Sequence, residues 1–247
     1  MWLFEQNGFD NALRISHVIV GVMWIGLLWF FNFVQVPSYA EMDAAARNNA
    51  LDKLTWRALW WFRWAAMATV VFGILIVAVR PRVYDVDYWS SSTGLTLLLG
   101  IIMGLVMAAN VWMVIWPNQQ IVIANARNVQ AGGEANPDAP AAGRRGAMAS
   151  RQNTIFSLPL LVFMLGASHF YNASHFKQFD LGGGVWFVYF VIGVAIIAVL
   201  ELNALGMISG TGSGGLNMIY ETHKNAMWTG FALIAIFYIL AEILLRD

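Results

Sequence analysis

The feature that most constrains this chain is a series of apolar stretches, each about as long as a bilayer-spanning helix. Such a helix needs roughly 20 apolar residues, because ~30 Å of hydrocarbon must be crossed at ~1.5 Å per residue. Six segments reach or approach that length: 13–36, 58–79, 94–116, 154–171, 185–206 and 224–245. The sequence therefore predicts an all-α integral membrane protein built as a six-transmembrane-helix bundle.

The amino-acid composition favours the same class and excludes several others. Of the 247 residues, 59% are hydrophobic and 11% are charged, which is atypical of a soluble domain. The formal net charge is zero, so no nucleic-acid partner is expected. Cysteine is absent, which excludes thiolate metal sites, iron–sulfur clusters and covalently attached haem c. We predict a single transmembrane domain over residues 1–247, with the lipid bilayer as its solvent.

Two connecting segments combine apolar and charged residues in the way that helices lying on a membrane surface do. The first runs from Pro37 to Arg57, and the second runs from Gln119 to Gln130 after a Pro117-Asn118 start. We expect both to form amphipathic interfacial helices in the cytoplasmic loops. The segment 131–147, rich in Gly, Ala and Pro, is predicted to be a mobile loop.

Lysine and arginine are divided unevenly between the two ends of the predicted bundle. Nine belong to the loops between helices 1–2, 3–4 and 5–6 with their flanks: Arg47, Lys53, Arg57, Arg63, Arg127, Arg144, Arg145, Arg151 and Lys224. Five belong to the opposite end: Arg14, Arg80, Arg82, Lys177 and Arg246. Because positively charged loops stay in the cytoplasm, both termini are expected outside it.

Two histidines from different predicted helices are expected at the same depth near the outer face. His17 lies about one turn into the first helix, and His169 lies just before the end of the fourth, which runs the opposite way. Two neutral imidazoles facing each other across a macrocycle can ligate haem b. Gly21 lies on the same helix face as His17, and Gly166 lies on the same face as His169. Each glycine is one turn closer to the membrane centre than its histidine. The alternative is that each histidine is an interfacial side chain and each glycine serves only helix packing.

A second set of polar residues gathers at the cytoplasmic end of the predicted helices, where each is costly to bury and is thus a functional candidate. The set comprises Asn32, Gln35, Arg63, Asn110, Glu201 and His223. Guanidinium and carboxamide groups supply paired donors for a planar anionic substrate or a quinone head group. The alternative is a buried Arg63–Glu201 ion pair that only holds two helices together.

Four stretches resemble the urate oxidase N-terminal domain family, the membrane part of bacterial urate-oxidising enzymes that end in a cytochrome c domain. They are HVIVGVMWIGLLWFFNFVQVP (17–37), LWWFRWAAMATVVFGILI (59–76), GIIMGLVMAANVWMVIWPNQ (100–119) and SRQNTIFSLPLLVFMLGASHF (150–170), and the resemblance covers roughly residues 13–170. The run from His17 through Gly21 to Trp24-Ile25-Gly26 is also similar to the first helix of membrane-bound protoporphyrinogen oxidases. In those enzymes that histidine is a haem b ligand.

The resemblance implies a haem b redox protein of the bacterial inner membrane, with periplasmic N- and C-termini, that passes electrons toward a periplasmic cytochrome c. It also implies a link to urate oxidation. Since this chain has no cysteine, the cytochrome c is expected to be a separate polypeptide. The alternative function is a haem-free accessory subunit of a larger respiratory or photosynthetic membrane complex. A transporter is disfavoured because the two halves of the sequence show no convincing internal symmetry.

Overall fold

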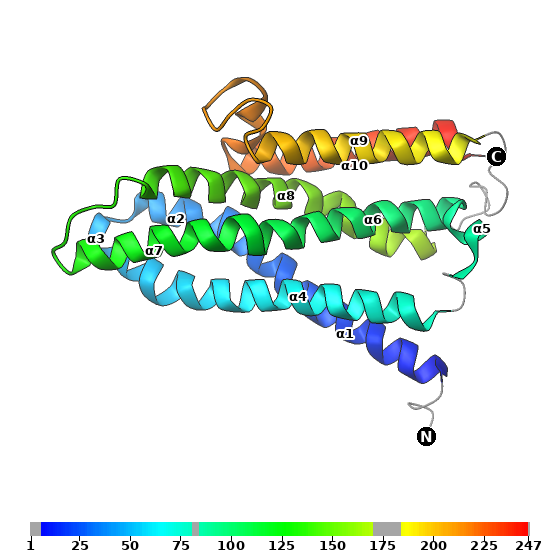
Figure 1. Ribbon diagram of the computed structural model, residues 1–247, viewed down its shortest axis with the longest axis horizontal. Coiled ribbons are helices and arrows are strands. Elements are labelled where there is room, and N and C mark those ends of the chain that lie inside the picture. The colour runs from blue at the N-terminus through cyan, green and yellow to red at the C-terminus, as the bar shows by residue number, and fades with distance from the viewer. Residues whose placement is uncertain (1–5, 81–83, 170–183, 247) are drawn as a thin grey trace.

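The computed structural model describes residues 6–80, 84–169 and 184–246. These residues form a bundle of helices that lie mostly side by side along the long axis of the molecule (Figure 1). The α-helices are α1 (Gln6–Trp29), α2 (Val36–Glu41), α3 (Ala44–Ala50), α4 (Trp56–Val79), α5 (Val86–Trp89), α6 (Ser92–Ala109), α7 (Trp116–Gln130), α8 (Ala139–His169), α9 (Val185–Ala204) and α10 (His223–Leu244). Shorter π-helical segments η2 (Phe30–Gln35), η3 (Leu51–Thr55) and η5 (Asn110–Ile115), and the 3₁₀ helix η7 (Gly215–Tyr220), join some of them. The all-α prediction is confirmed.

Five helices of the described chain are long and apolar enough to cross a membrane: Gly8–Glu41, Ala44–Val79, Ser92–Gln130, Val185–Ala204 and His223–Leu244. Large apolar side chains such as Ile19, Val22 and Ile74 are exposed on their outer faces. Continuous apolar surface of this kind suits contact with lipid tails rather than water. The helices are therefore compatible with a multi-pass membrane protein.

The described part of the remaining predicted span 154–171, residues 154–169, lies in α8, which is not among those five, and residues 170–171 lie outside the described residues. This 31-residue helix runs through the middle of the bundle and contacts α1, α6, α7, α9 and α10 (Figure 1). Its polar residues Gln152, Asn153, Thr154 and Ser157 are all buried by these neighbours. Because protein rather than lipid surrounds α8, it tolerates more polar side chains than an outer helix would.

The two segments expected to be interfacial helices instead continue the long helices. Residues 119–130 belong to a 39-residue helix formed by α6, η5 and α7, and residues 44–57 lead without a break into α4. At ~1.5 Å per residue these helices are roughly 50–60 Å long, so each extends well beyond ~30 Å of hydrocarbon. The break between α2 and α3 lies at Met42–Asp43, where the Asp43 carboxylate caps α3 by accepting the Ala46 N–H at 2.9 Å.

The predicted mobile loop 131–147 is shorter than expected, because α8 begins at Ala139. Alanine favours helix formation, and the first turns of α8 pack against α7. A Cβ at Gly143 would lie 3.7 Å from Val122, and one at Gly146 would lie 3.3 Å from Gln119. Ala142 is fully buried in this contact region. Only residues 131–138 connect the two helices.

Two of the π-helical segments have the same cause in the sequence. The segments η2 and η5 each end two residues before a proline. The Val36 N–H donates to the Phe31 carbonyl, and the Trp116 N–H donates to the Val111 carbonyl, each five residues back. Proline lacks an N–H, and its ring clashes with the carbonyl four residues earlier, so a regular α-turn cannot be kept there. These wide turns carry Asn32, Gln35 and Asn110.

Candidate functional site

Most of the buried polar side chains lie toward one end of the bundle. This end carries residues 131–138 and the segment 205–222, and we call it the loop end. The start of α1 and the end of α10 lie at the opposite end, which we call the termini end (Figure 1).

At the loop end, the buried Asn110 and Asn153 and the half-buried Glu201 form a hydrogen-bonded set that we call the amide–carboxylate network. Asn110 Nδ2 donates to Asn153 Oδ1 at 3.0 Å and to Glu201 Oε2 at 2.9 Å. Asn153 Nδ2 in turn donates to the Met107 carbonyl at 2.9 Å. Residues from η5, α8 and α9 are thus joined through one amide. The sequence-predicted pair Asn110 and Glu201 is brought together here, and Asn153 is an additional member.

Tyr220 lies beside this network and is fully buried. Its hydroxyl lies 2.8 Å from both Gln152 Oε1 and the Leu200 carbonyl, either of which can accept its proton. Burial raises the pKa of the Tyr220 phenol above its usual value. This side chain is therefore a neutral hydrogen-bonding group that joins η7 to α8 and α9.

Asn203 and Asn217 continue the polar groups outward to the segment after α9. Asn203 Nδ2 donates to Asn217 Oδ1 at 3.2 Å, and Asn217 Nδ2 donates to the carbonyls of Gly210 and Gly212. Gly206, with a φ of +78°, takes the left-handed conformation that ends α9 and turns the chain into this segment.

Arg144 of α8 anchors the same segment from the other side. Its guanidinium donates to the carbonyls of Thr211 and Gly212 and forms an ion pair of 2.8 Å with Glu221. Five donors in a planar fork allow one arginine to make all of these bonds. The glycine-rich segment is consequently a fixed turn at the loop end, held by Arg144 and Asn217.

Asn32 and Gln35, the predicted polar face of the first span, bind helices together at different places. Asn32 Nδ2 donates to Ser150 Oγ at 2.9 Å and ties η2 to α8. Gln35 Oε1 accepts a bond from Thr55 Oγ1, which also meets Tyr39 Oη at 2.8 Å. Neither side chain contacts the amide–carboxylate network through a direct hydrogen bond in the described chain.

Arg63 does not form the ion pair with Glu201 that the sequence allowed; no such pair occurs among the described residues. Its guanidinium lies 3.9 Å from the ring centroid of Trp116 and 5.4 Å from that of Trp112. Such cation–π contacts stabilise an arginine in a partly dry environment. The Arg63 Nε is buried and makes no hydrogen bond to the described residues. Arg63 and Asn110 therefore lie in different contacts, both of which involve η5.

His223 begins α10 at the loop end, where Thr222 caps the helix by accepting the Asn225 N–H at 3.0 Å. The imidazole is half-buried and lies edge-on to Phe33, with ring centroids 6.2 Å apart. The six predicted substrate-binding residues are thus divided among several helix contacts, and only Asn110 and Glu201 are hydrogen-bonded to each other.

At the termini end, His17 faces α4. A Cβ at Gly73 would lie 3.2 Å from His17 Cε1, so this glycine makes room for the imidazole. Gly21, one turn on, faces Thr69 of the same helix at 3.9 Å. The His17 Nδ1 is buried and has no hydrogen-bond partner among the described residues, and the imidazole lies beside the Thr69 backbone. A buried polar atom without a partner is uncommon in folded proteins.

His169 is the last described residue of α8, and its side chain lies outside the described residues. Gly166 is buried in the last turn of α8. The end of α8 points toward the termini end, as the start of α1 does (Figure 1). The expectation that both histidines belong to the same end of the bundle is consistent with this arrangement.

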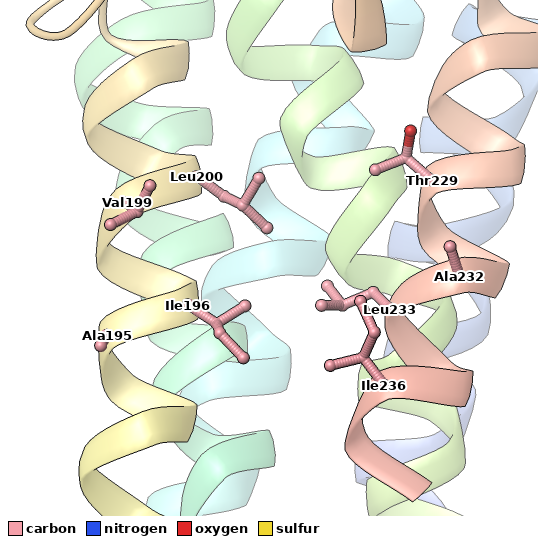
Figure 2. Close-up of a pocket in the computed structure, with 8 residues that line it drawn as sticks. All are labelled: Ala195, Ile196, Val199, Leu200, Thr229, Ala232, Leu233 and Ile236. Carbon is pink, nitrogen blue, oxygen red and sulfur yellow. The ribbon is translucent and has the colours of Figure 1, made fainter. Parts of the chain in front are cut away.

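An apolar groove of about 420 Å³ lies between α9 and α10 and is separate from the polar residues. Figure 2 shows the eight side chains that line it, among them Ile196, Leu200, Leu233 and Ile236. Thr229 supplies the one hydroxyl, and that group donates to the Asn225 carbonyl. The groove offers shape and apolar surface but no group for chemistry.

A family model described as urate oxidase N-terminal matches residues 67–201, more than half of the chain. This chain belongs to the urate oxidase N-terminal family. The family region begins within α4, includes all of α6 to α8, and ends at Glu201. Comparison with curated proteins gives no significant match, and comparison with solved structures gives none.

The family assignment from the sequence is confirmed, but the matched region differs from the expected 13–170. It extends through most of α9 and leaves out α1. Within the urate oxidase N-terminal family region lie Asn110, Asn153, Gly166, His169 and Glu201. The residues outside it are His17, Gly21, Asn32, Gln35, Arg63 and His223. The amide–carboxylate network is thus entirely a feature of the family region.

Sequence reasoning missed Asn153, Gln152, Tyr220 and Gly73. Gln152 and Asn153 precede the predicted fourth span by two residues and one residue, respectively, so the sequence places them in a loop. Two adjacent carboxamides directly before an apolar run were the available signal for them. Tyr220 and Gly73 had no comparable signal, because their roles depend on which helix lies opposite.

Proposed function

We propose that this member of the urate oxidase N-terminal family is a haem b redox protein of the bacterial inner membrane. It passes electrons toward a separate periplasmic cytochrome c, in a reaction linked to urate oxidation. The observation that carries the proposal is the buried, unpartnered Nδ1 of His17 beside Gly73. His17 and His169 would hold the iron, with Gly21 and Gly166 giving close access. Haem b, when bound, supplies a one-electron carrier.

The proposed membrane topology has six crossings, with α8 as the central one. The start of α1 and the end of α10 lie at the same end of the bundle, as an even number of crossings requires (Figure 1). The lysines and arginines divide nine to five in favour of the loop end. By the positive-inside rule, the loop end would be cytoplasmic and both termini periplasmic.

The proposed substrate site is at the loop end, for a planar anionic molecule of the urate type or a quinone head group. Arg63 supports it through a guanidinium with a free Nε between tryptophan rings, which suits stacking with a flat ligand.

The haem proposal is tested by a visible spectrum and a pyridine haemochrome assay on the purified protein. We expect a Soret band that is lost in His17→Ala and in His169→Ala, since each removes an iron ligand. His223→Ala, at the loop end, is the matched control and should keep the band. A wild-type protein without a Soret band would refute the proposal.

The topology is tested by single cysteines, which the cysteine-free chain accepts without background. We expect Ser213→Cys, in the exposed segment after α9, to react with an impermeant maleimide only after the inner membrane is opened. Asp87→Cys, in α5 at the termini end, should react in intact spheroplasts. Labelling of both from one side would rule out six crossings.

A second candidate function is a haem-free accessory subunit of a larger respiratory or photosynthetic complex. The groove between α9 and α10 favours it, because a lipid-facing apolar surface of this shape suits a partner helix (Figure 2). Copurification with a stoichiometric membrane partner, together with no visible absorbance, would favour this function over the first.

A further inference from the structure

Glu201 is an acidic side chain in the last turn of α9 that has no cationic partner. No Lys, Arg or His forms an ion pair with it among the described residues. Its hydrogen-bond partner is the neutral amide of Asn110, at 2.9 Å. Glu201 is half-buried, and a carboxylate withdrawn in part from water without a counter-charge is disfavoured, whereas binding a proton removes the charge.

The groups around Glu201 are almost all neutral. From η5 and α8 come the amides of Asn110 and Asn153, and from η7 comes the Tyr220 phenol, the titratable group coupled to Glu201 by charge. Arg151 of α8 instead donates to the Tyr220 carbonyl, and its charged neighbours are Arg144 and Glu221. Where α10 lines the groove against α9, its side chains are apolar apart from Thr229.

Two buried polar atoms near Tyr220 make no hydrogen bond to the described residues. They are Gln152 Nε2 and Asn203 Oδ1, on side chains that are 0% and 3% exposed. Buried polar atoms without protein partners are typically satisfied by internal water. One is an N–H donor and the other an oxygen acceptor, so a water molecule or a short chain of waters can satisfy both.

The same residues form a continuous series of polar groups from the surface inward. The exposed carbonyls of Gly210 and Gly212 accept from Asn217, and Asn217 accepts from Asn203. The Asn203 amide lies beside the Tyr220 phenol, whose hydroxyl bonds to the carbonyl of Leu200, the residue before Glu201. We call this series the asparagine ladder. It leads from solvent at the loop end to the carboxyl group inside the bundle.

We propose that Glu201 is a proton-binding site that exchanges protons with solvent at the loop end through water held along the asparagine ladder. The carboxylate takes one proton from water and becomes a neutral carboxylic acid, and it releases that proton by the same route. The site is assigned from Glu201 and its neighbours alone, so it does not require haem. In a redox protein, the proton would offset the charge of an electron that enters the bundle.

Infrared difference spectroscopy of the purified protein tests the site. A protonated carboxyl group gives a carbonyl band that shifts in heavy water. We expect this band at neutral pH in the wild-type protein, and its loss in Glu201→Gln. Glu221→Gln, which alters the ion pair with Arg144 at the surface, is the matched control and should keep the band. A spectrum without the band, or a band that persists in Glu201→Gln, would overturn the proposal.

Hydrogen–deuterium exchange of the same band tests the ladder. Asn203→Leu and Asn217→Leu should slow its shift in heavy water about tenfold or more, equivalent to ~1.4 kcal/mol in the barrier. Asn203→Ser leaves room for water and should exchange at nearly the wild-type rate, which separates a blocked route from misfolding. Asn128→Leu, in the exposed end of α7, is the control. Unchanged exchange in both leucine variants would eliminate this route.

Discussion

The termini end and the loop end of this bundle are built on different principles. At the termini end, α1 and α4 approach closely where His17 lies against Gly73. At the loop end, the carboxamides of Asn110 and Asn153 bond to each other, and Asn110 also donates to Glu201 of a third helix. Glycine contacts depend on shape alone, whereas an amide network depends on every donor finding an acceptor. A small substitution should therefore have unequal consequences at the two ends.

The largest effect is expected from Asn110→Leu, which removes the donor of both central bonds of the network. Asn153 Oδ1 and Glu201 Oε2 would remain buried without a donor, at a cost of about 2–4 kcal/mol in the free energy of unfolding. Reversible denaturation in detergent micelles measures it. Asn128→Leu, at an exposed asparagine, should cost less than ~0.5 kcal/mol. Equal values for the two variants would mean that the network does not hold the loop end together.

An intermediate effect is expected from Gly230→Ala, where α10 meets α8. A Cβ there would lie 2.7 Å from Leu158 Cδ1 and 3.0 Å from the Ile155 carbonyl, so the helices must separate. We expect a loss of about 1–3 kcal/mol in unfolding free energy. Gly26→Ala, which meets nothing within 4 Å, is the matched control and should be close to neutral. An equally neutral Gly230→Ala would contradict a close contact between α8 and α10 at this position.

The smallest effect on stability is expected from Gly73→Ala at the termini end. The new Cβ would lie 3.2 Å from the edge of the His17 imidazole, which can move by a few tenths of an ångström, so the cost should stay below ~1 kcal/mol. The sharper readout is the Soret band, which should shift or weaken if His17 is an iron ligand. An unaltered spectrum together with a large loss of stability would contradict both expectations: that the termini end tolerates this substitution, and that His17 is an iron ligand.

Much of the fold follows from the sequence because the bilayer leaves a chain few choices. Long apolar segments must be helices, since each backbone N–H and C=O needs a partner within its own segment. Pro37 and Pro117 also determine where the helices widen into η2 after α1 and into η5 after α6, because neither proline has a backbone N–H to donate. The resemblance to the urate oxidase N-terminal family identified the family correctly, although the matched region 67–201 leaves out the first of the four stretches and part of the second.

What the sequence could not determine is which polar residues meet. Helical periodicity gives the face on which Arg63, Asn110 or Glu201 lies, but not the helix that packs against that face. The tertiary structure decided that Asn110, and not Arg63, contacts Glu201, and that Arg63 lies against Trp116 instead. It also decided that α8 is the central helix, which is why Gln152 and Asn153 can be buried. Hydropathy sets which segments can enter the membrane, whereas side-chain packing sets their neighbours.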